Sequence, residues 1–145
     1  MIGLVTRPAV RTRAERLSGY RRVLEARSPQ TSVDRLRVLA TDEVRPVRLW
    51  TARNPATPAD ALDRLARDCD ASVRWNALVN PLLPDEALSW MAEREEGEHG
   101  SRWFHERSLI VHHPNASEGL RAELIAAGAC RCPEWCSGRS TFAAR

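Results

Sequence analysis

Proline divides this chain at a regular interval. Ser28-Pro29, Asn54-Pro55 and Asn80-Pro81 are evenly spaced, and His113-Pro114 follows the third step after a somewhat longer interval. Proline cannot donate a backbone hydrogen bond and disfavours helix at the residue before it, so each step ends one helix and begins a new segment. A fixed period of this length is typical of repeat proteins, whose units stack to form one core.

Within the unit 54–79 the residues predict two short helices. Thr57 is a good N-cap and Pro58 suits the first helical position, while Leu62 and Leu65 share one buried helical face. A turn and a second short helix then lead to the next Asn-Pro step. Apolar residues recur at equivalent positions of the other units, with Leu36, Leu62 and Leu88 in one register and Leu39, Leu65, Met91 and Leu124 in another.

The pattern Asn-Pro-x-Thr-Pro-x-x-x-Leu-x-x-Leu-Ala-x-Asp, followed by Val-Arg and a second Asn-Pro, resembles the variant leucine-rich repeat, a HEAT-like helical unit. Its clearest copy is 54–79, and the resemblance extends over 28–127. It implies an all-α, right-handed solenoid of about four short helical pairs. Such solenoids are general scaffolds, so the resemblance is specific for fold and weak for function.

The chain of 145 residues is long enough to bury a core without disulfides or metal. We expect a basic capping helix within 1–27, a repeat domain over 28–128 and a cysteine-containing tail at 129–145. An insertion around 95–101 accounts for the longer third interval. The predicted units are 28–53, 54–79, 80–112 and 113–128.

The basic residues are all arginines, and seven of them fall within 1–27. A basic segment of this kind is typical either of a solvated helix or of an arm that contacts phosphate backbones. No apolar run approaches the roughly 20 residues of a membrane span, and the start lacks the pattern of a secretory signal. These features predict a soluble cytoplasmic protein that does not enter a membrane.

Arginine recurs at one register of the repeats, at Arg48, Arg74 and Arg107. HEAT-like repeats use such arginines with preceding aspartates, here Asp42 and Asp68, as an internal ladder. HEAT-like glycosylases instead hold DNA on a basic concave face. Aromatic and arginine side chains together are typical of binding hot spots. The predicted partner-binding strip on the concave face is Arg48, Leu49, Arg74, Trp75 and Arg107.

The most distinctive chemical feature is the tail sequence CRCPEWC, which carries Cys130, Cys132 and Cys136. Three thiols this close together can converge on one metal, and zinc takes four Cys or His ligands. The fourth ligand could be Cys69, His112, His113 or an external group. Zinc and an iron–sulfur cluster are both candidates, and a tail of free thiols is the alternative to either.

No phosphate-binding loop, dinucleotide-binding glycine pattern or Gly-x-Ser-x-Gly elbow occurs. The sequence therefore predicts a non-enzymatic scaffold for a protein or peptide partner. DNA or RNA binding through the arginine-rich surface and a metal-linked role of the cysteines are the alternatives. An open terminal unit also makes a homodimer a candidate assembly.

Overall fold

The computed structural model describes residues 12–94, 101–130, 132 and 136–143. Every regular element within these residues is an α-helix, and the described part contains no strand. The all-α prediction is confirmed. No helix among the described residues is long and apolar enough to cross a membrane. The helices are α1 (Arg13–Arg27), α2 (Val33–Leu39), α3 (Arg45–Arg53), α4 (Ala59–Ala66), α5 (Ala71–Leu78), α6 (Asp85–Glu93), α7 (Ser101–His112), α8 (Glu118–Ala126) and α9 (Ser137–Ala143).

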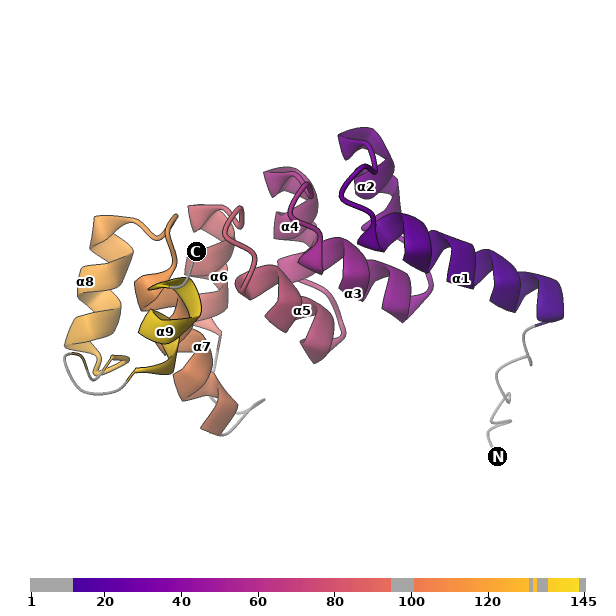
Figure 1. Cartoon of the computed structure of the whole chain (residues 1–145). Coiled ribbons are helices and arrows are strands. Elements are labelled where there is room, and N and C mark those ends of the chain that lie inside the picture. The colour runs from indigo at the N-terminus through magenta and orange to yellow at the C-terminus, as the bar shows by residue number, and fades with distance from the viewer. Residues whose placement is uncertain (1–11, 95–100, 131, 133–135, 144–145) are drawn as a thin grey trace, which may run out of the picture.

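The helices form two layers that run along the molecule (Figure 1). One layer contains α2, α4 and α6, and the other contains α1, α3, α5 and α7. The contacts of α1 with α3 and of α3 with α5 are more extensive than those between neighbours in the first layer. Each unit therefore packs mainly on the unit before and after it, as in a stacked repeat array.

The predicted apolar registers form the core. All seven side chains of the two leucine registers are buried, and Leu36, Leu62, Leu65 and Leu88 are fully inaccessible. Recurrence at i and i+3 places them on the helix face that meets the opposite layer. The helical periodicity read from the sequence therefore identified the buried face of each first helix.

The start of α4 differs from the prediction. Pro58 is the N-cap and makes no side-chain cap hydrogen bond. Thr57 is fully buried, and its hydroxyl donates to the Thr51 carbonyl at 2.6 Å. The threonine therefore satisfies a carbonyl at the end of α3 instead of capping α4, because the tight turn directs its side chain back toward the preceding helix.

Each Asn-Pro step is a hydrogen-bonded joint between units. The Asn80 side-chain amide donates to the carbonyls of Ala52 (2.9 Å) and Asn54 (3.1 Å), one repeat earlier. Its Oδ1 accepts from the Leu82 amide at 3.1 Å. Asn54 makes the same three kinds of contact with the preceding unit. A buried asparagine thus ties each loop to the one before it, which explains the recurring Asn-Pro step.

His113 performs this task at the next joint. Its Nε2 contacts the Asn80 carbonyl at 3.0 Å, and its Nδ1 accepts from the Asn115 amide at 3.1 Å. Both contacts are satisfied by a neutral ring that carries its proton on Nε2. The ring is fully buried, and burial lowers the pKa of His113. This histidine therefore substitutes structurally for the asparagine of the earlier units.

Replacing His113 tests this equivalence. We expect His113→Asn to change the free energy of unfolding by less than about 1 kcal/mol, because the amide supplies the same donor and acceptor. His113→Leu is expected to cost about 1–3 kcal/mol, since it leaves the Asn115 amide without a partner and the Asn80 carbonyl with the Leu83 amide alone. Urea unfolding of the two variants measures the difference. Equal losses would show that the ring acts only by filling space.

Candidate metal centre and partner surface

Three segments from the end of the chain bring the predicted cysteines together. Helix α7 ends at His112. After α8, Gly128 adopts a left-handed backbone with φ 78°, and the Ala129 amide donates to the Leu124 carbonyl. This glycine-terminated turn directs the chain back toward α7 and places Cys130 beside His112. Cys136 directly precedes α9.

Four donor atoms meet at this point: His112 Nε2 and the Sγ atoms of Cys130, Cys132 and Cys136, all within 4.8 Å of one another. His112 Nε2 lies 3.1 Å from the Cys130 sulfur and 3.4 Å from the Cys132 sulfur. The sulfurs of Cys130 and Cys136 are 3.8 Å apart. Of the ligand candidates left open by the sequence, the geometry selects His112.

These separations fit a single tetrahedral ion. With Zn–S bonds of about 2.3 Å and a Zn–N bond of about 2.0 Å, neighbouring ligand atoms of a tetrahedron lie about 3.5–3.8 Å apart. Three of the six donor pairs, at 3.1, 3.4 and 3.8 Å, lie near that value, and the remaining pairs lie within 4.8 Å. Donors this close together suit one ion better than a multi-iron cluster, whose cage spreads its thiolates more widely.

The surroundings adjust the protonation of the donors. Burial by itself would raise the pKa of Cys136, but hydrogen bonds from the Ser108 hydroxyl and the Arg139 amide outweigh it and lower the pKa to about 7. Burial raises the pKa of Cys130 to about 11. Burial also lowers the pKa of His112, assisted by the charges of Arg139 and Arg121, which favours the neutral ring that a metal requires.

Helix α9 holds Cys136 in place. It contacts α7 more extensively than any other helix does, and a Cβ added at Gly138 would overlap the Ser108 carbonyl. Ser108 Oγ lies 3.0 Å from the Cys136 sulfur, and the Phe142 ring packs edge-on against His113 at 5.1 Å. The predicted tail thus includes a docked helix, whose position depends on a glycine at the closest approach.

Cys69 lies elsewhere, in the loop between α4 and α5. It is exposed, and its sulfur is 3.6 Å from an Asp68 oxygen. Ser108 and Gly138 were not expected from the sequence, because their roles depend on the contact between α7 and α9. Residues 1–11 of the predicted basic capping segment 1–27, and residues 95–100 of the predicted insertion 95–101, lie outside the described residues.

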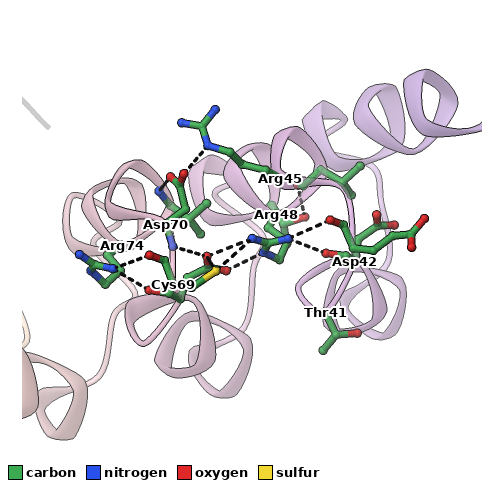
Figure 2. A network of polar contacts seen from close by, with 12 residues as sticks. Thr41, Asp42, Arg45, Arg48, Cys69, Asp70 and Arg74 are labelled. Carbon is green, nitrogen blue, oxygen red and sulfur yellow. Dashed lines mark hydrogen bonds and ion pairs between the residues drawn. The ribbon is translucent and has the colours of Figure 1, made fainter. Parts of the chain in front are cut away.

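The arginines of the predicted partner strip bond within the stack (Figure 2). Arg48 contacts both carboxylate oxygens of Asp68, at 2.6 and 3.1 Å, and donates to the Asp42 carbonyl at 2.9 Å. Arg74 donates to the carbonyls of Asp68 (2.8 Å) and Cys69 (3.0 Å). Side-chain exposure is only 14% for Arg48 and 8% for Asp68.

The ladder extends toward the N-terminus, and the arginine register extends to Arg107. Arg22 makes the same two-oxygen contact with Asp42, and Arg107 donates to the Ala92 carbonyl at 2.8 Å. The Arg22–Asp42 and Arg48–Asp68 pairs are the contacts of an internal ladder between neighbouring units, whereas Arg74 and Arg107 donate to carbonyls within their own units. Leu49 and Trp75 occupy one register and are half-buried against the core. Recognition of a partner by this strip stays a prediction.

A comparison with protein families agrees with this architecture. The family model described as Leucine rich repeat variant matches residues 45–70, which contain α3, α4 and the turn to α5. The matched stretch includes the ladder residues Arg48 and Asp68 and the joint at Asn54. No curated protein and no solved structure matches the chain. The chain therefore carries a leucine rich repeat variant unit, the family that the Asn-Pro pattern predicted.

Proposed function

We propose that the protein is a non-enzymatic helical-repeat scaffold whose C-terminal unit is closed by one structural Zn²⁺. The ligands are His112, Cys130, Cys132 and Cys136. The observation that carries this proposal is the convergence of their four donor atoms within 4.8 Å. Four protein ligands complete a tetrahedron and leave no position for water or substrate, which is typical of structural rather than catalytic zinc.

In this proposal the ion fixes α9 against α7. Helix α9 contains seven residues, and a helix this short is not stable by itself in water. Coordination by Cys136 ties α9 to His112 at the end of α7, while Cys130 and Cys132 fix the loop after α8. Zinc then adds coordinate bonds to three segments that otherwise associate through the packing of α9 on α7 and hydrogen bonds of the loop.

The scaffold role follows from the repeat architecture. Stacked units of this kind form a right-handed solenoid with a continuous concave face that suits a protein or peptide partner. The layer of α1, α3, α5 and α7 has the closer contacts between units, which supports its assignment to the concave side. Leu49 and Trp75, half-buried on that layer, supply the apolar part of the surface, and the ladder arginines keep the units in register.

Metal content tests the proposal directly. We expect one Zn²⁺ per chain in protein purified without chelator, and loss of that zinc in Cys132→Ser and His112→Ala, since each removes one of four ligands. Cys69→Ser is the matched control and should retain the zinc, because this exposed thiol lies outside the cluster. Wild-type protein without metal, or a visible iron–sulfur absorption in place of zinc, would contradict the assignment.

A further inference from the structure

Two arginines and one tryptophan form an uncompensated basic site at the other end of the molecule. Arg27 ends α1, and Arg53 ends α3 at the equivalent position of the next repeat. The guanidinium carbons lie 4.6 Å (Arg27) and 4.8 Å (Arg53) from the centre of the Trp50 ring. Stacking on an aromatic ring holds a guanidinium in place while its N–H groups remain available to an anion.

The charges of this site differ from those of the ladder. Arg22, Arg45 and Arg48, on the same two helices, each face a carboxylate. Arg27 and Arg53 are exposed, and no carboxylate among the described residues pairs with either. Each of these two positive charges is held beside the Trp50 ring without a carboxylate partner in the described part of the chain, so an anionic group that contacts either guanidinium would gain a favourable charge interaction.

A groove begins at Arg53 and continues toward the next unit. It has a volume of about 390 Å³ and is lined by Pro55, Trp75, Val79 and Pro81, together with Asn76 and Asn80. Val79 stands in the register of Arg27 and Arg53, one repeat further on. The register therefore carries arginine at its first two positions and an uncharged valine at the third.

We infer that this edge binds an extended acidic peptide. Its carboxylates contact Arg27 and Arg53, and a following apolar side chain occupies the groove beside Trp75 and Val79. The inference rests on the scaffold part of the proposed function and names its partner class. Charge-assisted pairing with guanidinium groups supplies specificity, and the aromatic and proline surface supplies apolar contact.

A nucleic acid fits this edge less well. Its backbone carries a charge at every nucleotide and needs a continuous basic track. Helix α5 contributes only Arg74, which is buried and bonded to backbone carbonyls. The basic surface therefore does not continue along the groove, whereas one pair of arginines followed by a groove of mixed polar and apolar lining matches a peptide with a short acidic stretch.

Peptide selection tests the inference. Peptides are selected from a random displayed library, and the affinity of synthetic copies of the selected peptides is then measured. We expect enrichment of Asp or Glu followed by an apolar residue. Binding should weaken about tenfold or more in the double variant Arg27→Gln/Arg53→Gln, and similarly when the peptide acids become Asn or Gln. Arg64→Gln is the matched control, because it removes an exposed charge from α4 in the other layer, and it should change affinity less than about twofold.

Three results would overturn the inference. The selected peptides could show no acidic enrichment over the input library, the double variant could bind them unchanged, or single-stranded oligonucleotides could bind more tightly than any selected peptide. Zinc content is measured on the same samples and should be unaffected by the arginine changes. Retained zinc with no peptide binding would refute this inference alone, and peptide binding by a metal-free protein would refute only the zinc assignment.

Discussion

Removing the metal is expected to lower the free energy of unfolding by about 4 kcal/mol or more, measured against protein in excess zinc. The expected size follows from binding linkage, because an ion that binds the folded chain and not the unfolded one adds its binding free energy to stability. Cys130→Ser should have the same effect, since its sulfur lies 3.1 Å from His112 Nε2 and 3.8 Å from the Cys136 sulfur. Urea denaturation with and without a chelator measures the loss.

The loss should be concentrated at the C-terminal end. Without the ion, α9 keeps only its contacts with α7 and the Phe142–His113 ring pair, so amide exchange over 136–143 should accelerate to nearly unprotected rates. Amides of α3 and α4 should remain protected because the extensive contacts of these two helices are with each other and with α1, α2, α5 and α6, and not with α7, α8 or α9. Cys69→Ser, with or without chelator, is the control for loss of a thiol. Unchanged exchange over 136–143 after chelation would contradict a structural role of the metal.

The sequence predicted the repeat more completely than it predicted the site. The apolar registers and the Asn-Pro joints depend on interactions within one unit or between adjacent copies, so helical periodicity and the conformational limits of proline are enough to reveal them. The exception was Thr57, which has the chemistry of a cap but donates to Thr51 in the preceding helix. A capping preference is local, and a packed neighbour overrode it.

The metal site depends on contacts between distant segments. The three cysteines were visible as candidates, but His112 lies well before Cys130 in the chain and could not be distinguished from His113 by spacing. The structure separates the two because His113 occupies the asparagine position of a joint, so its ring is bonded to Asn80 and Asn115. Alignment of His113-Pro114 with the Asn-Pro steps was the one sequence signal that assigned His113 to the repeat.

The role of the arginine register also depends on contacts that the sequence does not reveal. Its period was clear from the sequence, but a period alone does not tell whether the guanidinium groups face a neighbouring unit or a partner. Burial and carboxylate contacts place Arg48 in the ladder. Arg27 and Arg53 form a second arginine register that was not recognised, because its significance depends on the stacking of both guanidinium groups on Trp50.

Asp68→Ala is expected to destabilise the protein by about 3–4 kcal/mol. The change removes the carboxylate that binds Arg48 through two oxygens and that also accepts the Asp70 amide at 2.9 Å. Arg48 would remain largely buried with a charge that no side chain compensates, and an uncompensated buried charge costs more than the pair itself contributes. Urea unfolding of the zinc-loaded variant isolates this effect from the metal site.

Asp34→Ala is the matched control. Its ion pair with Arg37 leaves the aspartate side chain 92% exposed, so the loss should stay below about 0.5 kcal/mol. The double variant Asp68→Leu/Arg48→Met should recover part of the stability, because apolar side chains of similar size leave no charge uncompensated. Equal losses in Asp68→Ala and Asp34→Ala would show that the ladder is an ordinary surface ion pair.

The pH dependence of stability provides an independent check on Asp68. Burial opposes its ionisation, but the Arg48 guanidinium and the Asp70 amide outweigh burial, so the pKa of Asp68 lies below its ordinary value. A carboxylate with a lowered folded-state pKa stabilises the fold above its unfolded pKa of about 3.9, and this stabilisation is lost as the pH falls through the folded value. The wild type should therefore lose more stability than Asp68→Ala as the pH falls from about 5 through this range. Parallel acid profiles of the two proteins would contradict the ladder contact, because the Arg48–Asp68 pair would then contribute nothing that protonation removes.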